Sequence, residues 1–113
     1  MKAAALLLAF AATTAQAEFF TGNKLHQWAT EMNSSTLSWA MLHGYVSGAY
    51  DMGMGAQHCA PASVTLGQVV DMVKLHLENN PAIRHASGDL IVTFVLRQAW
   101  PCPKRESRPG SSL

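Results

Sequence analysis

Two cysteines, Cys59 and Cys102, constrain this chain more than any other feature of its 113 residues. The chain opens MKAAALLLAFAATTAQAEFF, in which Lys2 precedes an uncharged apolar run and Ala15-Gln16-Ala17 follows the small-x-small rule for signal-peptide cleavage. We therefore expect residues 1–17 to be a signal peptide that is cleaved after Ala17. An exported protein with two cysteines is expected to form a disulfide, and two separate thiols are the alternative.

The predicted disulfide has a large effect because the core of the mature chain is small. Cleavage would leave Glu18 to Leu113, 96 residues, which is a length for one domain with a modest core. A bond between Cys59 and Cys102 would close a loop of about 44 residues and stabilise the fold by about 4 kcal/mol. That is a large share of the roughly 5–15 kcal/mol that separates folded from unfolded proteins.

Apolar residues recur with helical spacing in four segments, at about residues 21–32, 36–52, 65–79 and 87–99. The second segment is apolar nearly all round, which is typical of a central, mostly buried helix. The fold class that we expect is all-α, a compact bundle of four main helices closed by one disulfide. Residues 18–103 would form the single helical domain. Residues 104–113, which are polar and contain Gly, Ser and Pro, are expected to be a disordered tail.

Capping residues support these boundaries. Thr65 followed by Gln68 is a capping-box pattern and predicts the start of the third helix. Ser34 or Ser35 is expected to cap the second helix, and Ser87 the fourth. The run from Leu90 to Val95 is rich in β-branched residues and would also suit a buried strand, but no partner strand is visible elsewhere.

Charge and composition exclude several classes of function. The mature chain would carry seven basic and seven acidic residues, so it lacks the basic surface that a nucleic-acid-binding protein needs. No second segment is long and apolar enough to span a membrane after signal cleavage. The five histidines are scattered, and a disulfide-bonded Cys59 cannot act as a nucleophile. We therefore expect no catalytic site and no cofactor, and the chain is not expected to be an enzyme.

The stretch from Met52 to Cys59 offers a metal site as an alternative. Met52, Met54, His58 and Cys59 carry soft ligand atoms that suit Cu(I). In the simpler interpretation the methionines end a helix against the core and Cys59 is bridged. We adopt that interpretation and predict no metal site.

Two glycines lie inside the second predicted helix, in the stretch HGYVSGAYD, and each costs roughly 1 kcal/mol relative to alanine. Ala40, Gly44 and Gly48 repeat every four residues and form one stripe of small residues. The stripe predicts a neighbouring helix packed closely inside the fold, and a homodimer contact is the alternative. Asp51 is an acid near a helix C-terminus, where the helix dipole disfavours it, so we expect a partner such as Arg97.

These segments, in their order, resemble the Rap/Tai family of periplasmic immunity proteins of type VI secretion. The resemblance covers about residues 36–102, and its elements are GYVSGAYD at 44–51, Cys59, VTLGQVVDMVKLHLENNP at 64–81 and AWPC at 99–102. It implies an all-helical periplasmic domain whose structural motif includes Gly44, Tyr45, Gly48, Asp51, Gly67 and Gln68. It also implies a function, because the best-known members bind and block an exported amidase that cuts peptidoglycan cross-link peptides. The Met-rich DMGMGAQHC and the segment after Cys102 depart from the family pattern, so the resemblance does not identify the effector.

A protein of this kind would contact its effector through loops and exposed helix faces. Ile83 is apolar in an otherwise polar turn, which suits an anchor inserted into a cleft. The alternative is that Ile83 closes the core beneath the turn. The candidate contact residues lie on the polar side of the third helix and in the following turn: Asp71, Lys74, Glu78, Asn80, Ile83, Arg84 and His85.

The resemblance thus implies a periplasmic immunity protein that sterically blocks a secreted cell-wall amidase. The alternative is a periplasmic housekeeping or chaperone-like binding protein with no toxin partner.

Overall fold

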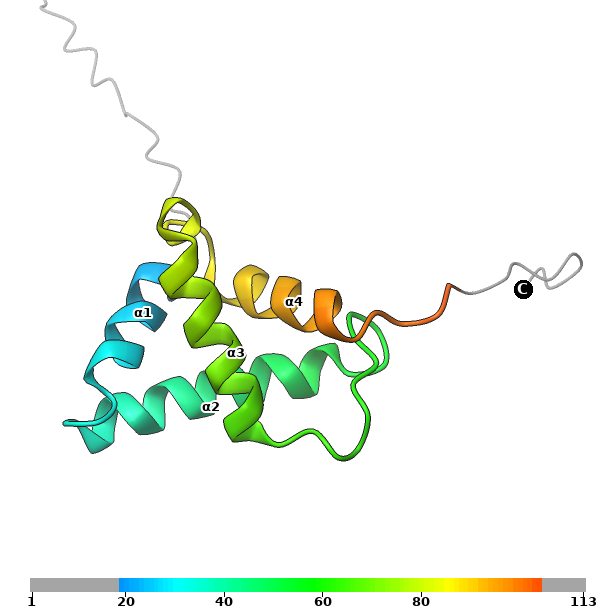
Figure 1. The fold of residues 1–113 in the computed structure, drawn as a ribbon, viewed down its shortest axis with the longest axis horizontal. Coiled ribbons are helices and arrows are strands. Elements are labelled where there is room, and N and C mark those ends of the chain that lie inside the picture. The colour runs from blue at the N-terminus through cyan, green and yellow to red at the C-terminus, as the bar shows by residue number, and fades with distance from the viewer. Residues whose placement is uncertain (1–18, 105–113) are drawn as a thin grey trace, which may run out of the picture.

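A computed structural model describes residues 19–104, which form four α-helices (Figure 1). They are α1 (Gly22–Glu31), α2 (Thr36–Gly53), α3 (Leu66–Asn79) and α4 (Gly88–Ala99), with a short 3-10 turn, η1 (Pro81–Ile83), before α4. Within this range the only β pairings are two isolated bridges, so the all-α prediction is confirmed. None of the helices in residues 19–104 has both the length and the hydrophobicity of a membrane span. The predicted signal peptide and nearly all of the predicted tail lie outside the described residues.

The helix starts follow the predicted caps at two of three places. The Thr65 hydroxyl oxygen accepts the Gln68 N–H at 3.2 Å, and the Ser35 hydroxyl oxygen accepts the Ser38 N–H at 3.2 Å. Ser87 occupies the N-cap position of α4, but its side chain makes no capping bond to the helix backbone. Its hydroxyl donates to the Asp89 carboxylate instead, so the predicted cap is wrong in its bonding although right in its place.

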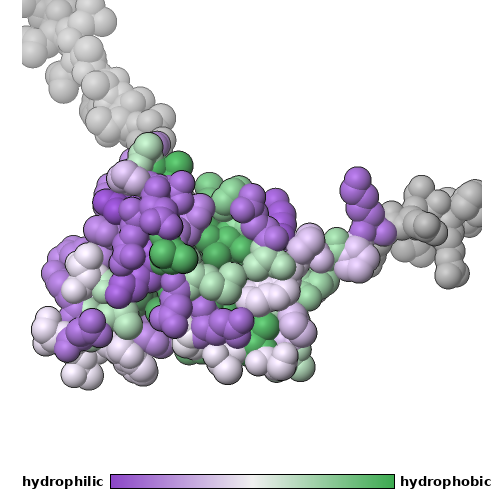
Figure 2. Space-filling model, viewed as in Figure 1, coloured by the Kyte–Doolittle hydropathy of each residue, from purple (hydrophilic) through white to green (hydrophobic). Residues whose placement is uncertain are grey.

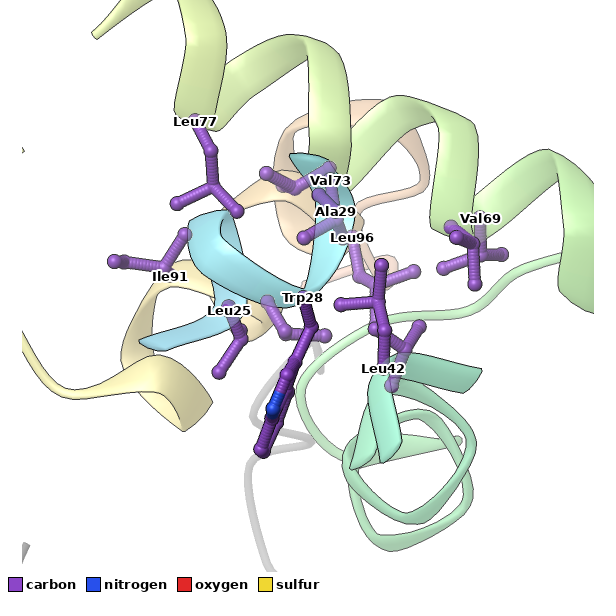
Figure 3. Packing of buried hydrophobic residues seen from close by; sticks show 13 residues of the cluster. Leu25, Trp28, Ala29, Leu42, Val69, Val73, Leu77, Ile91 and Leu96 are labelled. Carbon is purple, nitrogen blue, oxygen red and sulfur yellow. The ribbon is translucent and has the colours of Figure 1, made fainter. Parts of the chain in front are cut away.

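The core is built from one buried face of each helix, and Figure 3 shows these side chains pointing toward one another. Fully burying a side chain such as Leu or Val contributes about 1.5–3 kcal/mol, so this cluster is the main stabilising element of the fold. Its members are Leu25, Trp28, Ala29, Leu42, Val46, Val69, Val70, Val73, Leu77, Ile91, Val92, Val95 and Leu96.

The predicted disulfide is present. The Cys59 and Cys102 sulfur atoms are 1.98 Å apart, and the Cα atoms are 4.8 Å apart. The Cys59 N–H also donates to the Trp100 carbonyl at 2.8 Å. The bond therefore ties the loop between α2 and α3 to the residues that follow α4.

The His58 side chain holds the stretch from Met52 to Cys59 in place through contacts with the backbone of Tyr50 and Ala60. The His58 side chain is fully buried, with Nε2 2.9 Å from the Tyr50 carbonyl oxygen and Nδ1 3.4 Å from the Ala60 nitrogen. Both ring nitrogens thus have backbone partners, as a buried imidazole requires. The described residues contain no cluster of three or more His, Cys, Asp or Glu side chains that could hold a metal. Only the Met52 and Met54 thioethers remain of the four proposed copper ligands, and we do not retain the copper interpretation. The expectation that these methionines end the helix against the core is also wrong, because Met52 is 86% and Met54 42% exposed.

The stripe of Ala40, Gly44 and Gly48 does not pack inside the fold, so that prediction is wrong. All three residues are exposed, and a Cβ atom added to Gly44 or Gly48 would meet no atom within 4 Å among the described residues beyond its own stretch of helix. The expectation that α2 is buried nearly all round fails for the same reason. Its buried residues Leu42 and Val46 lie on the face opposite the stripe, because a helix presents only one side to a core of this size.

The close approach occurs instead between the starts of α1 and α4. The Gly22 N–H donates to the Ala86 carbonyl and the Gly88 N–H to the Phe20 carbonyl, each at 2.9 Å. A Cβ on Gly22 would lie 2.8 Å from the Arg84 carbonyl oxygen. A Cβ on Gly88 would lie 2.9 Å from both a Leu25 methyl carbon and the Tyr45 hydroxyl oxygen. These two positions leave no room for a larger residue.

Aromatic side chains cover this crossing. The Phe20 ring lies edge-on to Trp28 and Tyr45, with ring centroids 4.9 and 5.8 Å apart. Burial raises the pKa of Tyr45 above its ordinary 10.0, and the negative charge of Asp89 raises it further, against the opposing effect of a hydrogen bond from the Asp89 backbone. The Tyr45 hydroxyl is therefore neutral at physiological pH and serves as a packing group of the core.

We expect Gly44→Ala and Gly48→Ala each to raise the free energy of unfolding of the monomer by about 1 kcal/mol. Each adds a methyl group in open space and removes the conformational cost of a glycine within a helix. Urea unfolding followed by circular dichroism measures the change. As a control, Gly55→Ala should destabilise, because Gly55 has a φ of 81°, which disfavours other residues. Loss of stability at Gly44 or Gly48 would contradict the exposed placement of the stripe.

Candidate protein-contact surface

The seam between α3 and α4 holds two hollows that share His76 and Asn80. One has a volume of about 300 Å³ and the other about 410 Å³. We call this surface the α3–α4 seam. The smaller hollow is lined by His76, Asn80, Ile83, Ala86, Leu90, Ile91 and Phe94, and the larger by Met72, Leu75, His76, Asn79, Asn80, Val95, Gln98 and Ala99.

Large apolar side chains are exposed along the seam. Leu75 is 57% exposed, Leu90 63% and Phe94 47%. Figure 2 shows hydrophobic side chains gathered between α3 and α4 on the face in view. An apolar patch rimmed by polar residues marks a contact site in a soluble protein, because exposing such an area to water is unfavourable.

A polar pair stands where the two hollows meet. The Asn80 side-chain nitrogen donates to the His76 carbonyl at 2.9 Å and lies 3.4 Å from the His76 Nδ1 atom. The His76 ring packs against Phe94, with centroids 5.4 Å apart. A few fixed polar groups in an apolar wall orient whatever binds there. The seam therefore combines exposed apolar side chains, which can contact a partner, with the His76–Asn80 polar pair between the two hollows.

Arg84 fixes the turn at one end of the seam. Its Nε donates to the Leu77 carbonyl at 2.7 Å, and a terminal nitrogen lies 3.4 Å from the Glu78 carbonyl oxygen. The last carbonyls of a helix lack partners within the helix, so a guanidinium group at this position caps α3. Arg84 was predicted only as a contact residue, although a basic side chain just beyond a helix C-terminus is a signal for this capping role.

Of the predicted contact residues, only two line the seam. Asn80 and Ile83 line the seam. Ile83 also packs against the core, which agrees with the alternative prediction that it closes the core beneath the turn. Asp71, Lys74 and Glu78 form a neighbouring stripe of α3 and line neither hollow. His85 is exposed in the turn beyond η1.

The exposed apolar residues of the seam were not predicted from the sequence. Leu90 and Phe94 belong to the apolar run of the fourth predicted helix, but the core takes only Ile91, Val92 and their neighbours Val95 and Leu96. Leu90 and Phe94 are four residues apart and share the other side of α4. The signal was present, since six of the seven residues from 90 to 96 are apolar, which is more than one buried stripe requires.

The remaining motif residues lie away from the seam. Gly67 and Gln68 occupy the exposed first turn of α3. Asp51 is also exposed, seven residues after Gly44 on the outward stripe of α2. Arg97 donates to the Gln57 side chain, so the proposed pairing of Asp51 with Arg97 is wrong. Asp51 instead borders a hollow of about 170 Å³ that is also lined by Thr65 and Leu66 at the start of α3.

Comparison with protein families shows that residues 21–102 match the family model described as Rap1a immunity proteins. The matched span begins just before α1 and ends at Cys102, so it includes all four helices, the disulfide and the seam. A search of curated proteins finds no match.

Proposed function

Because this chain belongs to the Rap1a immunity protein family, we propose that it is a periplasmic immunity protein of type VI secretion. The proposed partner is a secreted amidase that cuts peptidoglycan cross-link peptides. The proposed mechanism is steric: the chain covers the substrate cleft of the effector, and no covalent bond is made or broken. The chain itself acts by binding and not as an enzyme.

The α3–α4 seam is the observation that carries this proposal. Binding energy at protein interfaces concentrates in a few anchors that fill pockets, surrounded by a polar rim. The hollows beside Leu75 and Phe94 are suited to accept such anchors from the effector. The neighbouring stripe of Asp71, Lys74 and Glu78 would supply the rim.

The rigidity of the surface also favours tight binding. The Arg84 cap holds the turn after α3, and the Cys59–Cys102 bond restrains the segment after α4. A surface that is already ordered loses less conformational entropy on binding, and more of the contact energy appears as affinity. A standard interface buries about 800 Å² on each partner, which is more than the two hollows alone provide. We therefore include the α3 stripe and the turn at His85 in the proposed contact.

The proposal places the mature chain in the periplasm. We propose that residues 1–17 are removed after Ala17, that residues 18–103 are the functional domain, and that the tail from Lys104 is dispensable for binding. The disulfide supports an oxidising compartment, because such bonds are rare in reducing ones. Amino-terminal sequencing of the exported protein should begin at Glu18.

The test is capture of the effector from the secreted proteins of the producing organism, followed by an activity assay. We expect the mature chain to recover a cell-wall amidase and to abolish its cleavage of peptidoglycan cross-link peptides near one equivalent. Recovery of no cell-wall hydrolase, in conditions where a known effector pair survives, would contradict the proposal. Recovery of many unrelated unfolded proteins would instead favour the chaperone-like alternative.

We also propose that the outward stripe of α2 is a contact for a second copy of this chain. Gly44 and Gly48 cost helix stability and make no close contact with other segments of residues 19–104, and Leu37 on the same side of α2 is 72% exposed. Gly44→Leu should give a folded monomer by analytical ultracentrifugation where the unmodified chain sediments as a dimer. A monomeric unmodified chain at high concentration would refute this contact.

A further inference from the structure

A second groove runs between α2 and α4, on the other side of Leu90 and Phe94 from the seam. Its volume is about 540 Å³. Met52 stands on its wall and is 86% exposed, the most exposed of the large apolar side chains within α1 to α4. The groove is lined by Ala49, Met52, Gly53, Gln57, Asp89, Leu90, Thr93, Phe94 and Arg97.

The two charged residues of this lining have opposite signs and lie at opposite ends of α4. Asp89 and Arg97 are eight residues apart, which is about 12 Å along a helix. Asp89 accepts a hydrogen bond from the Ser87 hydroxyl, and Arg97 donates to the Gln57 side-chain amide oxygen. Both partners are uncharged, so these bonds leave a negative end and a positive end with an apolar stretch between them.

We propose that this groove binds an extended segment of a partner polypeptide that carries a basic and an acidic side chain four residues apart, with an apolar side chain between them. An extended chain rises about 3.3 Å per residue, so four residues span about 13 Å and match the separation of the two charges. The basic side chain lies at Asp89, the acidic one at Arg97, and the apolar one on Met52, Leu90 and Phe94. Complementary charges at the ends of an apolar contact fix its register and its specificity.

This inference takes only one point from the proposed function, namely that the partner is a protein. The groove shares Leu90 and Phe94 with the seam, so one effector could reach both surfaces. The order of the basic and acidic side chains in the bound segment, however, depends only on Asp89 and Arg97. Short peptides test it without the effector, and failure of the peptides would leave binding at the seam untouched.

The experiment is a titration of the ¹⁵N-labelled mature chain, followed by amide chemical shifts, with four blocked peptides. The first, Lys-Ser-Leu-Ser-Glu, has the matching charges, and Lys-Ser-Leu-Ser-Lys, Glu-Ser-Leu-Ser-Glu and Lys-Ser-Ser-Ser-Glu each lack one element. We expect the first peptide to shift the amides of Met52, Gln57 and Phe94. Each of the others should bind about fivefold more weakly, as expected for the loss of one modest contact.

Charge reversal provides the matched control. Arg97→Glu gives the groove two acidic ends and should then prefer Lys-Ser-Leu-Ser-Lys by about fivefold, whereas Asp89→Lys should prefer Glu-Ser-Leu-Ser-Glu by a similar factor. Both residues are exposed, and thermal unfolding of each variant verifies that it folds. The inference would be overturned if the amide chemical shifts of the groove residues did not change at about 10 mM peptide, or if the peptide affinities did not change with these charge reversals.

Discussion

Removal of the Cys59–Cys102 bond is expected to lower the free energy of unfolding by about 4 kcal/mol, because the bond closes a long loop and restricts the unfolded chain. The core comes from four short helices, and such small domains have little stability to spare. We expect Cys59→Ser/Cys102→Ser to unfold at a much lower urea concentration than the oxidised chain. The midpoint of urea unfolding, with the slope held in common, measures the difference.

The oxidised chain in reductant should behave as the double serine variant does. Local contacts reinforce this expectation, since the Cys59 N–H bond to the Trp100 carbonyl and the buried His58 both lie beside the disulfide. Equal unfolding midpoints with and without reductant would show that the disulfide does not contribute to the stability of the helical fold. Two free thiols in the exported form, found by mass spectrometry, would contradict the account more directly.

Gly22→Ala and Gly88→Ala are expected to destabilise the fold by about 2 kcal/mol each, the second largest effect on stability that the structure predicts. A methyl group at Gly22 would meet the Arg84 carbonyl, and one at Gly88 would meet Leu25, the Tyr45 hydroxyl and the Phe20 carbonyl. The backbone bonds from Gly22 to Ala86 and from Gly88 to Phe20 would have to lengthen. Thermal and urea unfolding measure the loss.

The matched controls are Gly44→Ala and Gly48→Ala, which make the same chemical change within α2. The four variants should separate by sign, with a gain at the two exposed glycines and a loss at the two crossing glycines. A gain of stability at Gly22 or Gly88 would mean that α1 and α4 do not meet as closely as described.

The helices could be predicted from sequence because each carries local signals for its own limits. The Thr65–Gln68 pattern, the serines before Ser38 and Asn80-Pro81 after α3 act within one or two turns of the chain. The apolar spacing of α1 and α3 then shows which side is buried. The disulfide followed from the predicted export of a chain with two cysteines.

The close-packing glycines could not be identified because contact between helices depends on where two distant segments cross. The spacing of Gly44 and Gly48 indicates a smooth stripe, but it carries no information on which side of α2 meets the core. Gly22 and Gly88 have no such spacing, since each lies at the start of its helix, where glycine is unremarkable. Their role as close-packing residues becomes visible only in the structure, where an isolated antiparallel bridge pairs Thr21 with Ser87.

The contact surface was predicted in part for a similar reason. Asn80 and Ile83 were identified because a polar turn with one apolar residue is a local pattern. Leu75, Leu90 and Phe94 were not, because an apolar residue on a helix is ordinarily assigned to the core. Which apolar side the core leaves uncovered depends on how many helices pack around it, and four short helices leave the seam open.

The affinity of the captured amidase for two variants tests the central claim, binding through the α3–α4 seam, most directly. Leu75→Lys places a charge in the seam, and Leu66→Lys places the same charge on the exposed first turn of α3, where Leu66 is 41% exposed. Isothermal titration calorimetry should give a dissociation constant at least about 30-fold higher for Leu75→Lys, as expected for a binding hot spot, and an almost unchanged one for Leu66→Lys. Equal dissociation constants for the unmodified chain and Leu75→Lys would show that the effector binds elsewhere.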